Sequence, residues 1–133
     1  MANGDPSVAL IQAAAQRDAE SFAAKIADVS LEAACDLWLR RVARRKVTPT
    51  QRARLIKAVE RGDAVEAKAV QLTRAALLRA AGLDDRPAAA AAVAAGATYT
   101  EVGAVLGVSQ QWISARMRSY LADAKAQSQS RPS

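Results

Sequence analysis

The sequence contains no histidine and only one cysteine, Cys35. Without histidine, the chain lacks the side chain that most often acts as a general base at neutral pH. A single cysteine cannot form an internal disulfide, and it suits a protein of the reducing cytoplasm. No cluster of cysteines and histidines could hold zinc, and no glycine-rich phosphate loop follows a strand. We therefore expect a protein that is not an enzyme and needs no cofactor.

Long apolar runs and large apolar side chains are also scarce. No run approaches the ~20 residues of a membrane span, and the N-terminus lacks the basic-then-apolar order of a signal peptide. Alanine makes up about a quarter of the chain, whereas Leu, Ile, Val and Phe together make up about a fifth. Abundant alanine with almost no strand-forming runs predicts an all-α fold. A core this thin is often completed by a second subunit, so we expect a homodimer, without a membrane partner.

The charge is positive and unevenly distributed. The net charge is +6 and the pI about 10.1, which suits a polyanionic partner. Residues 40–61 hold nine basic residues and one acidic residue, whereas residues 1–39 hold two basic and six acidic ones. A basic run is often only a solvated face, but this excess is larger than helix ends need. We predict that the block contacts DNA phosphates, chiefly through Arg40, Arg41, Arg44, Arg45, Lys46 and Arg52.

The N-terminal region is expected to form two helices. Ser7 is placed to cap a helix to about Ala27, and Ser30 to cap another to about Lys46. The first helix has apolar residues at nearly heptad spacing: Val8, Ile11, Ala15, Phe22, Ile26 and Val29. This stripe would either pack on the next helix of the same chain or form a dimer contact. On the second helix, Leu31, Cys35, Trp38 and Val42 share one face, so Cys35 and Trp38 are expected in the core.

Capping signals divide the middle of the chain. Residues 48–51, TPTQ, predict a capping box and a helix that ends at Gly62. Asp63, with Glu66 three residues later, predicts a further helix to about Ala81. Residues 83–87 are the best linker candidate, and residues 88–95 are alanine-rich and helical. We therefore expect a helical region over 1–83, a three-helix unit over 84–126 and a disordered tail over 127–133.

Residues 98–120 contain the motif on which the functional prediction depends. Thr98 and Glu101 form a capping-box pair, and Gly107 is suited to end the first short helix. Val102, Val105 and Leu106 would form the apolar face of that helix. Ser109 can cap a second helix, in which Ile113, Met117 and Tyr120 or Leu121 would be buried. Two short helices joined by a tight turn predict a helix-turn-helix, although a hairpin used only for packing remains the alternative.

The segment GATYTEVGAVLGVSQQ (residues 96–111) resembles the helix-turn-helix of sigma-factor region four and of many small actinobacterial regulators. The matching features are Gly103 inside the first helix, the turn of residues 107–109, and Ile113. The resemblance covers roughly residues 86–122 and implies that the second helix enters a DNA major groove. Arg116 departs from the family, which usually has an apolar residue there, and we expect Met117 to pack in its place.

The predicted second helix carries side chains suited to base edges. Glutamine can bond adenine, and arginine can bond guanine, in each case through two hydrogen bonds. The expected base contacts are Gln110, Gln111, Ser114, Ala115 and Arg118. Thr98 and Ser109 at helix N-termini, together with Arg116, are expected to contact phosphates. Trp112 is expected to pack, with Arg116 able to stack on it, and Asp84-Asp85 to serve as a helix cap.

These features predict a sequence-specific DNA-binding protein of the cytoplasm and nucleoid. The simplest mechanism is a dimeric transcriptional repressor that occupies a promoter. An alternative is an architectural or DNA-packaging adaptor, which binds any duplex and recruits a protein partner. A third possibility is a module that binds only other proteins.

Overall fold

The computed structural model describes residues 6–130, and side chains as far as residue 127. Every regular element in this part of the chain is helical, which confirms the predicted all-α class. The elements are α1 (Pro6–Leu37), a π-helical turn η2 (Trp38–Val42), α2 (Pro49–Arg61), α3 (Ala67–Ala80), α4 (Arg86–Ala94), α5 (Tyr99–Leu106) and α6 (Gln110–Ser130).

The N-terminal region forms one long helix rather than the two that were predicted. Ser30 does not cap a helix; its Oγ donates a hydrogen bond to the Ala27 carbonyl, 2.9 Å away, within α1. The same oxygen accepts a hydrogen bond from Arg74 Nε of α3, also 2.9 Å away. A serine inside a helix can bond to a carbonyl of the preceding turn, so the helix continues through it. Its cap-like position in the sequence was therefore misleading.

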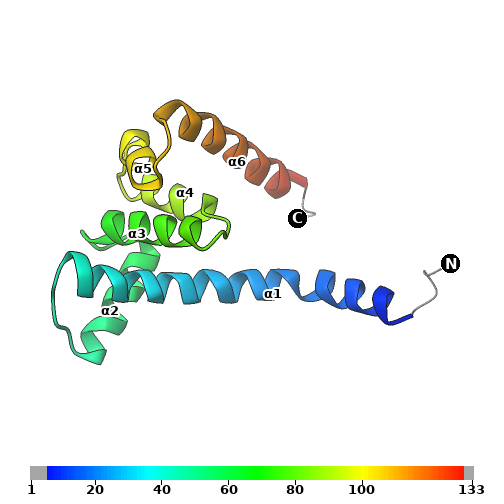
Figure 1. The fold of residues 1–133 in the computed structure, drawn as a ribbon, viewed down its shortest axis with the longest axis horizontal. Coiled ribbons are helices and arrows are strands. Elements are labelled where there is room, and N and C mark those ends of the chain that lie inside the picture. The colour runs from blue at the N-terminus through cyan, green and yellow to red at the C-terminus, as the bar shows by residue number, and fades with distance from the viewer. Residues whose placement is uncertain (1–5, 131–133) are drawn as a thin grey trace.

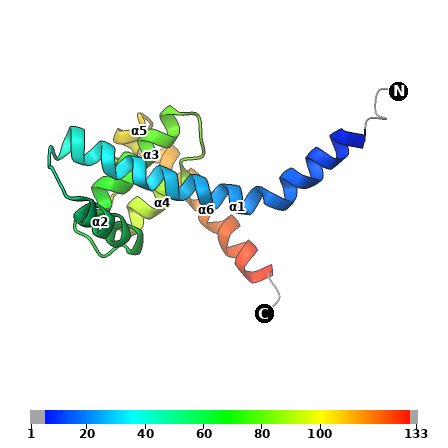
Figure 2. The ribbon, with the colours of Figure 1, turned by 90° about the horizontal axis from the view of Figure 1, so that it is seen from below.

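The first part of α1 projects away from the body of the protein (Figures 1 and 2). We call residues 6–25 the α1 arm, because every one of them is exposed. Val8, Ile11 and Phe22 are 54%, 66% and 64% exposed, so this apolar stripe does not pack on the next helix of the same chain. The intrachain interpretation is thus wrong for these three residues, which are left uncovered, whereas Ile26 of the same stripe is half-buried.

Two hydrophobic clusters form the core, and α3 contributes to both. One cluster joins the end of α1 and η2 to α2 and the start of α3, with Trp38 and Cys35 buried as predicted. The other joins the second half of α3 to α4, α5 and α6. Ala67 and Val70 of α3 belong to the first cluster, and Ala75 and Leu78 to the second. The predicted boundary between residues 83 and 84 would therefore separate α3 from the residues of α4, α5 and α6 with which its second half forms a cluster.

The capping signals in the sequence predict the start of α2 correctly and the start of α3 incorrectly. Thr48 and Gln51 form both hydrogen bonds of the predicted capping box, and Gly62 ends α2 with φ 76°. Asp63 instead receives a hydrogen bond from Arg61 Nε at 2.9 Å, and α3 begins only at Ala67. Arg61 thus draws the Asp63 carboxylate away from the helix that it was expected to cap.

At the other end, α6 extends to Ser130, so the expected disorder is wrong for residues 127–130. Residues 131–133 of that predicted tail lie outside the described residues. Among the described helices, none has a stretch both long enough and apolar enough for a membrane span.

We predict that Cys35 is unreactive in the folded protein. Burial, reinforced by the nearby Asp36 carboxylate, raises the pKa of the thiol to about 11. A raised pKa keeps the thiol protonated at mildly alkaline pH, where the reactive thiolate is scarce. Labelling with a disulfide reagent at pH 8 should therefore be slow in buffer and fast in urea. Equally fast labelling in both solvents would contradict the buried position.

Candidate nucleic-acid interface

The start of α5 is fixed by the predicted capping box. Thr98 Oγ1 accepts a hydrogen bond from Glu101 N, and Glu101 Oε1 accepts one from Thr98 N, each at 3.0 Å. Lys68 of α3 reaches the other oxygen of Glu101 at 2.9 Å. The backbone hydrogen bond from Thr98, followed by the hydrogen bond from Lys68, lowers the pKa of Glu101 below its usual value. The carboxylate therefore stays charged and links the beginning of α5 to α3.

The turn between α5 and α6 requires two glycines. Gly107 ends α5 in the left-handed conformation, with φ 74°, as predicted. Gly103 lies inside α5, where an added Cβ would be 2.7 Å from the Val108 carbonyl oxygen. That oxygen belongs to the backbone and cannot easily move aside. Any larger residue at position 103 would therefore push the turn, and α6 with it, away from α5.

The first two turns of α6 pack as the sequence predicts. Ser109 Oγ accepts a hydrogen bond from Trp112 N at 3.1 Å, which confirms Ser109 as the cap. Ile113 is fully buried and Met117 is 1% exposed, and Tyr120, rather than the exposed Leu121, continues the buried face. On α5, Val102 and Leu106 are buried, but Val105 is 41% exposed, so its predicted place in the core is wrong.

The predicted base-contacting residues lie mainly on the outer face of α6. Gln110, Gln111, Ala115 and Arg118 are exposed, whereas Ser114 is half-buried at the edge of this face. Ile113 and Met117 turn the opposite side of the helix toward α4 and α5. Within the described residues, Arg118 makes no ion pair, so its guanidinium remains available to a ligand. We call Gln110, Gln111, Ser114, Ala115 and Arg118 the recognition face.

Arg116 has a structural partner that the sequence did not reveal. Its guanidinium donates a hydrogen bond to the carboxylate of Asp85, which is only 1% exposed, at the start of α4. Arg79 of α3 is also near, with its Nη1 3.7 Å from Asp85 Oδ2. Of the adjacent aspartates, only Asp84 bonds a helix N-terminal amide, accepting from Arg86 N at 3.1 Å. Arg116 is therefore occupied inside the protein, and we do not assign it to a phosphate.

Trp112 lies on the flank of α6 between two arginines. The Arg116 guanidinium is 4.8 Å from the centre of its ring, as the predicted stacking requires, and that of Arg79 is 5.3 Å away. The side chain remains 42% exposed, so it covers the two arginines rather than packing beneath the helix. Trp112 thereby makes cation–π contacts with both arginines that lie near Asp85.

The structure does not bring the basic block of residues 40–61 to the recognition face. In Figure 1, η2 and α2 lie on one side of the body and α6 on the other. α2 packs on α1 and α3 and makes no contact with α4, α5 or α6. Of the predicted phosphate contacts, Thr98 and Ser109 lie at the starts of α5 and α6, and Arg116 lies on α6 itself.

Two of the predicted phosphate contacts in the block are paired within the protein. Arg52 binds Asp36 through two hydrogen bonds of 2.6 and 2.9 Å, and these lower the pKa of Asp36 below its usual value. Arg45 is 3.8 Å from Glu66 and stacks over Trp38, with 5.1 Å between its guanidinium and the ring centre. The predicted residues Arg40, Arg41, Arg44 and Lys46 are exposed and make no ion pair within the described part of the chain.

The described residues contain no group of three or more acidic, cysteine or histidine side chains that could hold a metal ion. Comparison of the chain with protein-family models, curated proteins and solved structures gives no match.

We predict that Asp85 and Asp84 differ sharply in their contribution to stability. Asp85→Asn removes a charge buried against Arg116 and leaves that arginine without its partner, which should cost about 2–4 kcal/mol of unfolding free energy. Asp84→Asn is the matched control, because its side chain is 48% exposed and its loss should cost under about 1 kcal/mol. Urea unfolding measures both variants. Equal losses would mean that the Asp85 pair does not hold α6.

Proposed function

We propose that this protein binds double-stranded DNA sequence-specifically through the recognition face of α6. The observation that carries the proposal is the fixed geometry of α5, the turn and α6. Capping bonds, a close backbone contact at Gly103 and the buried Ile113 and Met117 leave glutamines and Arg118 pointing outward. A helix of about 10–12 Å diameter fits the major groove, which is about 12 Å wide.

The outward side chains suit base edges of different kinds. Gln110 and Gln111 offer an amide that can bond adenine at N6 and N7, and Arg118 can bond guanine at O6 and N7. Ala115 can contact a thymine methyl group, and each good bidentate contact contributes about 1–3 kcal/mol of discrimination. The start of α6, after Ser109, presents backbone amides to which a phosphate would bind, whereas the Thr98 and Glu101 amides at the start of α5 are engaged in the capping box. The phosphates would set the register of α6, and the bases would set its sequence preference.

A dimer is part of this proposal, because one helix reads only a few base pairs. The uncovered stripe of the α1 arm continues along α1 as Val8, Ile11, Ala15, Phe22, Ile26 and Val29, with spacings of three, four, seven, four and three residues. These spacings read the same in both directions. Two antiparallel copies would therefore place Val8 opposite Val29, Ile11 opposite Ile26, and the small Ala15 opposite the large Phe22. Such a contact is self-complementary, as a twofold dimer requires.

In the cell, such a dimer would act most simply as a repressor that occupies a promoter on the nucleoid. The adaptor that binds any duplex is the second candidate, and the exposed cations of residues 40–61 are the observation in its favour. Selection of bound molecules from random duplex DNA tests the choice. Enrichment of one motif by ~10³-fold over random DNA supports a regulator, whereas no enrichment supports an adaptor.

Gln111→Ala should relax base preference without unfolding the protein. Gln111 is exposed on the recognition face, so its loss removes a base contact of about 1–3 kcal/mol and no core packing. Selection from random duplex DNA with the variant should give a motif that is degenerate at one or two positions. Gln16→Ala, an exposed glutamine of the α1 arm, is the matched control and should leave the motif intact. An unchanged motif in Gln111→Ala would place the recognition surface elsewhere.

Phe22→Glu should convert the dimer to a monomer. Phe22 is 64% exposed in the stripe, and burying a glutamate charge in a helix pair is costly. Leu10→Glu is the matched control, because Leu10 is 70% exposed on the α1 arm but lies outside the stripe. Sedimentation equilibrium gives the mass of each variant. Dissociation by both changes, or by neither, would argue against the stripe as the contact.

A further inference from the structure

The cations of residues 40–61 divide into those that the protein neutralises and those that it leaves exposed. Three of the nine have acidic partners: Arg45 with Glu66, Arg52 with Asp36 and Arg61 with Asp63. The other six are exposed and make no ion pair with any residue that the structure describes. We call these six the basic surface: Arg40, Arg41, Arg44, Lys46, Arg54 and Lys57.

Two residues of the basic surface, Arg44 and Lys46, lie in a loop of fixed conformation between η2 and α2. Between η2 and α2, Ala43 N donates to the Trp38 carbonyl at 2.8 Å and Arg45 N to the Leu39 carbonyl at 2.9 Å. Arg44 has φ 50°, a left-handed conformation that is uncommon for a residue with a Cβ. A strained residue persists only where its surroundings hold it, and such residues concentrate at functional sites.

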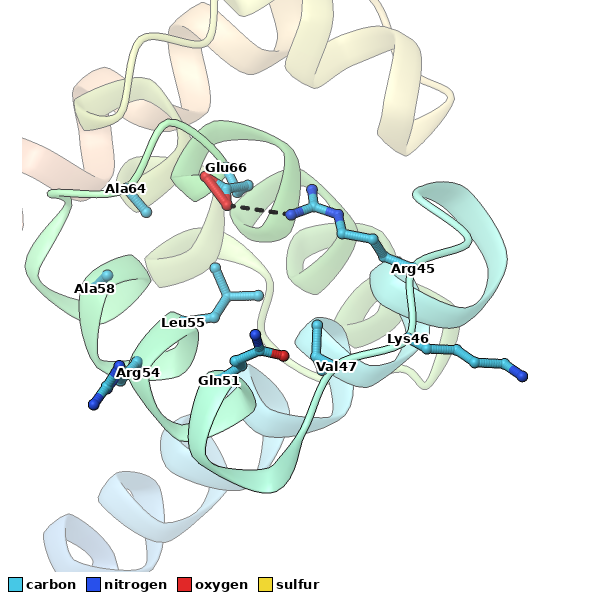
Figure 3. Close-up of a pocket in the computed structure, with 9 residues that line it drawn as sticks. All are labelled: Arg45, Lys46, Val47, Gln51, Arg54, Leu55, Ala58, Ala64 and Glu66. Carbon is cyan, nitrogen blue, oxygen red and sulfur yellow. Dashed lines mark ion pairs between the residues drawn. The ribbon is translucent and has the colours of Figure 1, made fainter.

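Two shallow hollows flank this loop. One, shown in Figure 3, has a volume of about 440 Å³ and is bordered by Lys46 and Arg54 at opposite ends. The other has a volume of about 590 Å³ and is bordered by Arg40, Arg44 and Lys46. Lys46 borders both and points away from the protein in Figure 3. The exposed cations therefore spread over a broad, open surface rather than around one enclosed pocket.

This surface and the recognition face point to different sides of the molecule. Figure 1 places α2 and α6 on opposite sides of the body, and α2 touches only α1 and α3. The recognition face is the side of α6 away from its core contacts with α4 and α5. A straight duplex bound along the recognition face would thus pass on the far side of the protein from the basic surface.

We propose that the basic surface is a second DNA-binding surface, which grips the phosphates of a different duplex segment from the one that α6 reads. One protein molecule would then bridge two duplexes. This inference rests on the proposed function, since α6 must hold the first duplex. Cations spread over a surface match the repeated charges of a phosphate backbone. If all six contact phosphates, a plot of log affinity against log salt concentration should have a slope of about −5. The basic surface would bind the second duplex without contacts to base edges and without a bound small ligand.

A capture experiment tests the bridge. One duplex is fixed to beads, a second duplex of unrelated sequence carries a fluorophore, and the full-length protein is added. Retention of the second duplex reports bridging, and fluorescence anisotropy with one duplex reports simple binding. The test variant is Arg44→Glu with Lys46→Glu. The control is Arg17→Glu with Lys25→Glu, an equal change of charge at exposed positions of the α1 arm.

The wild-type protein and the control should retain the second duplex on the beads. The test variant should retain at least roughly tenfold less of the second duplex. It should still bind a single duplex through α6. A second variant, Arg40→Glu with Arg54→Glu, leaves the strained Arg44 unchanged. It removes one cation beside each hollow and should lose retention of the second duplex as the test variant does. Bridging by the two recognition helices of a dimer would survive both variants. Retention that survives them, or a wild type that binds one duplex and never captures another, would overturn the bridge. A wild type that binds no duplex would instead overturn the proposed function.

Discussion

The orientation of α6 depends on one buried carboxylate. Asp85 stands at the start of α4, and it holds Arg116 of α6 and attracts Arg79 of α3. A carboxylate that is 1% exposed would be very unfavourable without partners, so three helices are constrained to meet around it. Because Arg116 is fixed, the rotation of α6 about its axis is fixed too. That rotation decides whether the glutamines of the recognition face point toward DNA or along the surface of the protein.

The local elements of this geometry could be predicted from sequence, because their signals lie within a few residues of each other. Thr98 with Glu101, Thr48 with Gln51, and the left-handed Gly107 all occur as predicted. The Asp85–Arg116 pair could not be predicted, because 31 residues separate the partners. Its only trace in the sequence was a charge at position 116, where the resemblance leads one to expect an apolar residue. Whether the recognition face contacts DNA stays a prediction.

The failures at Ser30 and Arg116 share a physical cause: each residue was expected in a local role and instead bonds a distant partner. Ser30 has the chemistry of a cap, but it bonds Arg74 across 44 residues and lies inside a continuous helix. Arg74 is itself buried, and it also donates to Gln71 Oε1 at 3.0 Å, so a small polar network lies between the two clusters of the core. Since α3 supplies residues to both clusters, loss of either one would leave α3 half-packed. We therefore infer that the two clusters unfold together, although sequence alone suggested separate regions.

The unequal distribution of charge assigns different partners to the different surfaces. The α1 arm carries two basic and two acidic residues, so it has no net charge to attract phosphates, and its exposed apolar residues are left for an apolar partner. The basic surface has the opposite character, with six exposed cations and no apolar stripe of comparable length. The recognition face has few charges and mainly amide groups, which suit base edges better than phosphates. Since the body of the protein separates α2 from α6, occupation of one of these surfaces need not block another. If the proposed DNA binding and self-association both occur, they can add to each other, since two weak contacts on one tethered complex give an avidity that neither has alone.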